Sequence, residues 1–168
     1  MTYAERERLF VALFEQSRAG IRRLCYSYLN SASEVDDLFQ EIMTNVWNSL
    51  TKFRGEAQAS TWVYRIAVNT ALIYRRRRRP SEELPDMPDQ RVSTHGDLER
   101  QEQLEALHRA IAQLGDQDRL IVSLMLEGLS YKEIAEVTGM TVNYVGVKIS
   151  RIKQALEQLL TEATHGTV

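Results

Sequence analysis

The residues best suited to chemistry lie between Phe53 and Arg79, in the sequence FRGEAQASTWVYRIAVNTALIYRRRRR. A helix from about Ser60 would place an aromatic ring, an amide and two guanidinium groups on one face, made of Trp62, Arg65, Asn69, Leu72 and Arg76. An aromatic ring can stack on an exposed base, an amide can hydrogen-bond a base edge, and arginines neutralise phosphates. This face therefore predicts contact with nucleic acid.

Five consecutive arginines, Arg75–Arg79, end the same segment. Residues 52–79 hold eight Lys or Arg against one acid, a net charge of +7, whereas the whole chain carries −2. Adjacent cations repel one another and need an anionic partner or full solvation, so phosphate contact is one interpretation. The other is a solvated basic helix end that suits the C-terminal dipole and stops at Pro80. The segregation of positive charge favours the first.

Length and composition set the limits of the fold. With 168 residues and 43% hydrophobic content, the chain suits one mid-sized globular domain or two small ones. No apolar run approaches the roughly 18 to 20 residues that cross a bilayer, and the N-terminus lacks signal-peptide features. We therefore expect a cytoplasmic protein.

Metal-binding and catalytic patterns are missing from the sequence. Cys25 lies in the apolar sequence IRRLCYSYL, which predicts a buried small hydrophobe, with a reactive thiol as the alternative. His95, His108 and His165 are isolated from one another and from Cys25, so we predict no metal and no cofactor. The motifs GxGxxG, GxxxxGK[ST], GxSxG and HExxH do not occur, so an enzyme is not expected.

The central helix must be positioned by the elements around it. A mostly apolar stripe at helical spacing predicts its buried face, made of Val63, Ile66, Ala67, Thr70 and Tyr74. Residues 5–29 read as a preceding helix with Gly20 as a candidate break, followed by a turn over Asn30–Ser33. Residues 1–79 thus predict a first domain of three or four helices with one core.

Ser33 is the expected N-cap of the next helix. Apolar residues cover one side of that helix, namely Val35, Phe39, Ile42, Met43, Val46, Trp47 and Leu50. Polar residues cover the other, namely Asp37, Gln40, Glu41, Thr44 and Asn48. From the residues alone, solvation is the simplest interpretation of this polar side.

Residues 80–96 read as a linker, because they contain all three prolines, few apolar residues and no period. Residues 80–105 carry eight acids and two arginines, a net charge of −6. An extended, solvated spacer is the simplest interpretation.

A second domain is predicted over residues 97–168. Its first helix begins near Asp97, ends at Gly115 and contains the apolar residues Leu98, Leu104, Leu107, Ile111 and Leu114. A short helix over Asp116–Leu126 follows.

The sequence GLSYKEIAEVTGMTVNYVGVKISRIKQALEQLL then has the layout of a helix-turn-helix, although an unrelated helical hairpin is the alternative. Ser130 and Glu133 form a capping box, and Ala135 is the small residue at the helix crossing. Gly139 supplies the turn, and Thr141 can cap the second helix.

The last helix also has two faces. Its buried stripe is predicted to be Val142, Val145, Ile149, Ile152 and Leu156. The residues that point away from this stripe, or flank the outer face, are Asn143, Tyr144, Val147, Lys148, Ser150, Arg151, Lys153 and Gln154. Such a face can enter a major groove while basic residues reach phosphates. Val147 lies at its centre, where its methyl groups suit a thymine methyl.

Taken together, these segments resemble a bacterial sigma factor of the extracytoplasmic-function class. EVDDLFQEIMTNVW is similar to region 2.2 of that family, FRGEAQASTWVYRIAVNTA to regions 2.3 and 2.4, and IAQLGDQDRLIVSLMLEGLSYKEIAEVTGM to region 4. The resemblance implies an all-α protein of two small helical domains, sigma domain 2 over residues 1–79 and sigma domain 4 over residues 97–168, joined by a flexible acidic linker.

The resemblance also implies partners and roles. They are the beta-prime and beta subunits of core RNA polymerase, promoter DNA and, as a family expectation only, an anti-sigma factor. Asp37, Gln40 and Glu41 match the surface that docks on beta-prime. Phe53 and Asn69 match the pocket for a base flipped from the minus-10 element, beside the loop Arg54–Ser60.

Two further surfaces follow from the resemblance. The phosphate contacts of minus-10 DNA fall on Arg75, Arg76, Arg78 and Arg79. The helix from Thr141 matches the minus-35 reader, and the acidic linker would lie in the RNA path of polymerase.

The sequence departs from the family at Gly146, where Lys or Arg is common, and at Val147, where a small polar residue is usual. Two other functions stay open. One is a helix-turn-helix regulator whose N-terminal domain dimerises or senses a ligand. The other is an interaction module that sequesters polymerase or a regulator. A duplex-binding repressor has no use for a base-capturing face, and a sequestering protein needs no second DNA site.

Overall fold

The structure is a computed structural model that describes residues 1–29, 31–55, 57–78 and 98–165. All regular elements in these ranges are helical, which confirms the all-α prediction. Arg79, the linker at 80–96, and the predictions that rest on Asn30 and Asp97 lie outside the described residues. In chain order the elements are α1 (Tyr3–Tyr28), α2 (Ala32–Ser49), the short 3₁₀ helix η1 (Leu50–Lys52), α3 (Ala59–Arg77), α4 (Leu98–Ala112), α5 (Asp116–Leu126), α6 (Tyr131–Thr138) and α7 (Val142–His165).

Two predicted helix signals near the N-terminus are wrong. Helix α1 continues through Gly20. Glycine weakens a helix without necessarily ending it, and the buried residues before and after Gly20 hold this helix in the core. The N-cap of α2 is Ser31 rather than Ser33, since the Ser31 hydroxyl accepts a hydrogen bond from the backbone N–H of Glu34 at 3.1 Å. Ser33 therefore lies inside the first turn.

Helices α1, α2 and α3 pack against one another around a shared core. Its fully buried side chains include Ile21, Leu24, Ile42, Val46 and Leu50. Cys25 belongs to this core with no exposed surface, and burial raises the pKa of its thiol to about 12. The prediction of a buried hydrophobe is confirmed, because a thiol with that pKa stays protonated and unreactive near neutral pH.

Helices α4 to α7 form the second unit, in which α6 and α7 are the two helices of a helix-turn-helix. Both halves of the capping box between Ser130 and Glu133 are present, and Gly139 ends α6 with a φ of +75°. Thr141 caps α7 by accepting from the N–H of Tyr144 at 3.2 Å. These sequence signals are local, so the sequence predicts them well.

One residue of the predicted stripe on α7 is not buried. Val145, Ile149 and Ile152 are at most 2% exposed, and Leu156 is half-buried, but Val142 is 48% exposed. Val142 is the first residue of α7, so its side chain precedes the turn at which the helix reaches its neighbours. In α4, Leu98 and Leu104 are likewise exposed.

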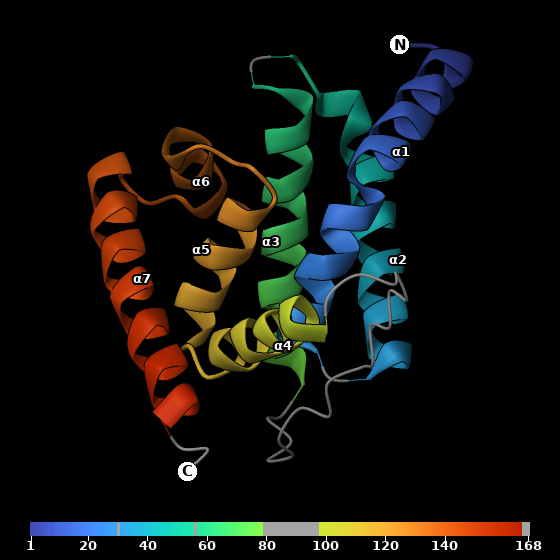
Figure 1. Cartoon of the computed structure of the whole chain (residues 1–168). Coiled ribbons are helices and arrows are strands. Elements are labelled where there is room, and N and C mark those ends of the chain that lie inside the picture. The colour runs from blue at the N-terminus through green and yellow to red at the C-terminus, as the bar shows by residue number, and fades with distance from the viewer. Residues whose placement is uncertain (30, 56, 79–97, 166–168) are drawn as a thin grey trace.

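The two units pack on one another, and α3 of the first unit lies next to the second unit. Figure 1 shows α3 in the middle, α1 and α2 on one side, and α5, α6 and α7 on the other. Helix α3 contacts α6 and helix α1 contacts α5, so the buried residues of both units form one continuous cluster. In the part of the chain described, no helix combines the length and the apolar character that a membrane span needs.

Candidate nucleic-acid interface

Two aromatic rings meet where the chain enters α3. The centroids of Phe53 and Trp62 lie 4.9 Å apart with an interplanar angle of 50°, and both residues are half-buried. Phe53 follows η1, and the turn after it contains Gly55 at a φ of +72°, which favours glycine. The chain thereby turns back so that both rings lie at the start of α3. The two rings form a half-buried apolar platform, and aromatic rings suit stacking on a base.

The outward face of α3 continues from this platform. Arg65, Asn69 and Arg76 are exposed, Leu72 is half-buried, and Arg54 is exposed in the loop before the helix. Asn69 lies seven residues beyond Trp62, two turns or about 10 Å along the helix on the same side. The structure thus brings Phe53 to Trp62 and presents Asn69 and Arg65 on the face that the sequence predicted.

The arginine run is paired with carboxylates of the same chain. Arg77 Nη1 lies 3.0 Å from Glu41 Oε1, Arg78 pairs with Glu34, and Arg75 Nη1 lies 2.5 Å from Asp116 Oδ1. Arg76 is exposed. Pairs this exposed contribute about 0 to 1 kcal/mol each, so phosphates can replace the carboxylates at little cost.

The polar side of α2 presents carboxylates and an amide. Asp37 and Gln40 are exposed, and Glu41 is half-buried beside Arg77. Burial, followed by the negative charges of Asp37 and Glu41, raises the pKa of Tyr74 above its usual value. The two carboxylates therefore lie close to Tyr74 of α3.

The outer face of α7 is open over its first half. Asn143, Tyr144, Ser150, Arg151 and Lys153 are exposed. Val147 is 42% exposed and Tyr144 45% exposed, so this face presents apolar as well as polar side chains.

One residue beside this face differs from the sequence interpretation. Lys148 is half-buried, and its Nζ lies 2.6 Å from Asp118 Oδ1 of α5, so it is held against the domain rather than extended outwards. A Cβ at Gly146 would lie 3.8 Å from the Tyr131 ring, an ordinary contact distance. Internal packing therefore does not require glycine at position 146.

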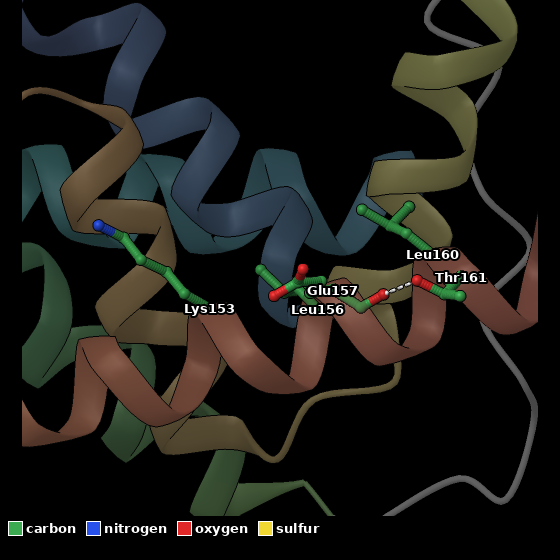
Figure 2. A pocket seen from close by; sticks show the side chains of 5 residues that line it. All are labelled: Lys153, Leu156, Glu157, Leu160 and Thr161. Atoms are coloured by element: carbon green, nitrogen blue, oxygen red, sulfur yellow. Dashed lines mark hydrogen bonds between the residues drawn. The ribbon is translucent and has the colours of Figure 1, made fainter.

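A shallow depression lies on the second half of α7. Figure 2 shows its lining, in which Thr161 Oγ1 donates a hydrogen bond to the Glu157 carbonyl at 2.7 Å, and the five side chains are Lys153, Leu156, Glu157, Leu160 and Thr161. All five come from one helix, whereas a catalytic site gathers reactive groups from several elements. These five side chains therefore do not form a catalytic constellation.

Sequence reasoning missed a third face of α3. Thr61, Tyr64, Val68 and Ala71 are at most 7% exposed, although none of them belongs to the predicted core stripe. Their spacing of three, four and three residues places them on one side of the helix. This side packs against the second unit, since Thr61 Oγ1 donates to Glu133 Oε1 of α6 at 3.3 Å. The spacing was the available signal, but polar Thr61 and the hydroxyl of Tyr64 obscured it.

Known protein families match both helical units. The model described as Sigma-70 region 2 matches residues 13–80, and the model described as Sigma-70, region 4 matches residues 104–156. The chain is 32% identical to the RNA polymerase sigma-H factor of Pseudomonas aeruginosa, over 92% of this chain and 87% of that protein. It is 30% identical to the ECF RNA polymerase sigma-E factor of Escherichia coli K12, over 90% of this chain and 86% of that protein.

Two solved structures share the fold. CnrH, solved with the cytosolic domain of CnrY, superposes with a TM-score of 0.69 at 23% identity, covering 92% of this chain and 89% of that chain. RpoE of Bartonella quintana, solved with the anti-sigma factor NepR, gives a TM-score of 0.72 at 19% identity, covering 92% and 96% respectively.

The region 2 match spans the aromatic platform and the outward face of α3, and the region 4 match spans the helix-turn-helix. The two RNA polymerase sigma factors named above align with this chain over 87% and 86% of their own length. The chain therefore belongs to the extracytoplasmic-function group of the sigma-70 family and is a sigma factor that directs RNA polymerase to promoters.

Proposed function

We propose that this sigma factor divides promoter recognition among three surfaces and carries out no covalent chemistry of its own. The first surface docks on core polymerase, the second captures a base of the minus-10 element, and the third reads the minus-35 element. The observation that carries the proposal is the Phe53–Trp62 ring pair on the exposed side of α3. A ring platform two helical turns from Asn69, on the same side of α3, suits an unstacked base and has no use in binding a closed duplex.

The docking surface is the polar side of α2. Asp37, Gln40 and Glu41 present acceptors on one side of a helix whose other side is buried in the core. The proposed partner is the beta-prime subunit, with the beta subunit near the second domain. Because polymerase is the partner, the site of action is the cytoplasm.

The minus-10 surface combines base capture with phosphate contact. Phe53 and Asn69 would hold the flipped base, and Trp62 with Arg54 and Arg65 would line its path. Unstacking a base costs a few kcal/mol, which stacking and hydrogen bonds offset. The proposed contacts to upstream phosphates are Arg75, Arg76, Arg78 and Arg79.

The minus-35 surface is the outer face of α7. Val147 lies in the middle of this face, where its methyl groups would contact a thymine methyl, and Arg151 would pair with guanine or phosphate. The remaining proposed contacts are Asn143, Tyr144, Ser150 and Lys153, with Lys148 joining them only if it leaves Asp118.

Run-off transcription tests the function as a whole. Purified chain and core polymerase are combined with a library of promoters that vary in the minus-10 and minus-35 elements. We expect a defined set of promoters to yield transcripts that neither component yields alone. A chain that binds promoter duplexes without core polymerase, and adds no transcripts with it, would instead be a conventional helix-turn-helix regulator.

A regulatory partner is a further proposal. The two similar solved structures contain CnrY and the anti-sigma factor NepR, each bound to its own sigma factor. We extend this kind of partner to the present chain, because its two DNA-reading units lie side by side where one protein can cover both.

Replacing Arg76 and Arg78 with glutamine should weaken promoter binding by the holoenzyme across all sequences. Phosphate contacts carry little sequence information, and each lost contact lowers the slope of log affinity against log salt by about one unit. Filter binding from low to high salt measures the slope. The control is Arg8→Gln with Arg18→Gln, two exposed arginines of α1. A double variant with the slope of the unmodified protein would show that the two arginines are only solvated.

A further inference from the structure

One arginine of α1 holds the end of α2. Arg6 donates from Nε and Nη2 to the backbone carbonyl of Trp47, at 3.2 and 2.5 Å. Its guanidinium carbon also lies 4.2 Å from the centroid of the Trp47 ring. The same side chain therefore contacts both the ring and the carbonyl of one residue. A planar guanidinium can lie on a ring and donate through its fork at once, whereas an ammonium group is a single point charge.

Two further rings of α1 hold Trp47 in place. The Phe10 ring lies 5.3 Å from the Trp47 ring with an interplanar angle of 87°, and the Tyr3 ring lies 5.8 Å from it at 73°. These edge-to-face arrangements are among those that aromatic pairs prefer. Tyr3, Arg6 and Phe10 all belong to about the first two turns of α1. The beginning of α1 and the end of α2 are thus joined through one tryptophan.

The carbonyl that Arg6 contacts lies where α2 changes into η1. It also accepts a hydrogen bond from the backbone N–H of Leu50, the residue that ends α2 and begins η1. The last turn of α2 contains no basic residue. Carbonyl groups at the C-terminus of a helix carry partial negative charge and favour a nearby cation. Arg6 therefore supplies from α1 the positive charge that the end of α2 lacks in its own sequence.

Two consecutive backbone hydrogen bonds connect this carbonyl to Phe53. The first runs from the Leu50 N–H to the Trp47 carbonyl, and the second runs from the Phe53 N–H to the Leu50 carbonyl at 3.1 Å. Leu50 has no exposed surface, so its side chain is held in the core. Figure 1 shows the start of α1 and the connection from α2 to α3 at the same end of the molecule. A displacement of the end of α2 would therefore pass directly to the Phe53 ring, which lies 4.9 Å from Trp62.

We propose that Arg6 is a positioning residue for promoter opening, which sets the place of Phe53 by holding the end of α2 through Trp47. The inference rests on the proposed function, because it assumes that Phe53 takes part in base capture. The Arg6 side chain contacts Trp47 and acts on Phe53 through the backbone of η1. The Phe53 ring is then in place before DNA arrives, so less ordering remains to be done when a base binds.

The ring pair in the free, full-length chain tests this connection without polymerase or DNA. The chain has two tryptophans, Trp47 and Trp62, so labelling with 5-fluorotryptophan gives two fluorine NMR signals, which Trp47→Phe assigns. Phe53→Ala should shift the Trp62 signal, because it removes the ring 4.9 Å away. Arg6→Gln should shift that signal in the same direction by a smaller amount. The matched control is Arg8→Gln, which removes an exposed arginine of the same turn and should leave the Trp62 signal unchanged. A Trp62 signal that Arg6→Gln does not move would overturn the proposal.

The opening kinetics of the holoenzyme test whether Arg6 acts through Phe53. Arg6→Gln should slow promoter opening on the order of tenfold, since loss of a hydrogen bond from a charged group shifts a local equilibrium by about that factor. Arg6→Lys keeps the charge and can still donate to the Trp47 carbonyl, so it should recover part of the rate. In a chain that already carries Phe53→Ala, Arg6→Gln should slow opening no further, because two changes that act on one contact are not additive. Stopped-flow fluorescence of a labelled minus-10 base measures these rates.

The same cycle separates positioning from general stability. If Arg6 only stabilised the fold, Arg6→Gln would slow opening by the same factor with and without the Phe53 ring, and that result would overturn the proposal. Thermal unfolding shows which variants are folded at the assay temperature, and Arg6→Lys replaces Arg6→Gln in the cycle if the latter is not. The two kinds of failure are distinguishable. A full opening rate in Phe53→Ala would contradict the proposed function itself, whereas slow opening in Phe53→Ala with an unaffected Arg6→Gln would contradict only the role of Arg6.

Discussion

Reversing the charges of Asp37 and Glu41 together, to arginine, is expected to weaken binding to core RNA polymerase on the order of 100-fold, since like charges facing each other across an interface cost several kcal/mol. Both carboxylates lie on the polar side of α2, one helical turn apart, and the opposite side of α2 is in the core. The helix should survive, because substitutions at exposed positions usually change stability by less than about 0.5 kcal/mol. Fluorescence anisotropy with labelled core polymerase measures the affinity.

The matched control for this pair is Glu7→Arg with Glu15→Arg, which makes the same total charge change at exposed positions of α1. The control should retain its affinity, because α1 does not carry the proposed docking surface. Reversal at Glu41 also places a cation beside Arg77, so thermal unfolding of both variants is needed. Equal affinities for the two variants would assign polymerase docking to another face.

Replacing Phe53 with alanine is expected to slow promoter opening by about 5- to 150-fold, because stacking of a base on an aromatic ring is worth about 1 to 3 kcal/mol. Asn69→Ala should instead relax the base preference at one minus-10 position, since an amide discriminates bases through paired hydrogen bonds. On templates whose minus-10 region is already unpaired, Phe53→Ala should still weaken binding to the exposed strand, and Asn69→Ala should still show the relaxed base preference. The reason is that the proposed contacts are with the unpaired base and not with the duplex.

Stopped-flow fluorescence of a labelled minus-10 base measures opening, and gel shift of the closed complex measures duplex binding. Phe53→Tyr is the control for the ring, because it keeps the stacking surface against Trp62. We expect duplex binding to be similar in all variants. If Phe53→Ala opens promoters as fast as Phe53→Tyr, or Asn69→Ala ranks every minus-10 variant as the unmodified protein does, the base pocket lies elsewhere.

The sequence predicted most reliably the features set by neighbours a few residues apart. The capping box of α6, the turn at Gly139, the limits of α5 and the outward faces of α3 and α7 depend on spacings of one to four residues. The same kind of local signal failed where two candidates compete. Ser31 and Ser33 can both cap a helix, and the choice depends on where the chain leaves α1.

The candidate site was predictable in outline for the same reason. Helical periodicity places Trp62, Arg65 and Asn69 on one face before any fold is known. The approach of Phe53 to Trp62 required the turn at Gly55. The pairing of Lys148 with Asp118, and of the arginine run with Glu34, Glu41 and Asp116, required helices that are distant in sequence to lie side by side.

By itself, the sequence determined the helices, the outward faces of α3 and α7, and the family, because these depend on local spacing and on long motifs. Only the tertiary structure decided what covers the third face of α3 and why Gly20 is a glycine. A Cβ atom on residue 20 would lie 2.5 Å from Glu127 Oε2, and still closer to the Tyr64 hydroxyl. Gly20, Tyr64 and Glu127 are far apart in the chain, and none of them carries a local signal for the other two. So close an approach exists only once three helices meet, since it depends on their relative positions and not on the periodicity of any one of them.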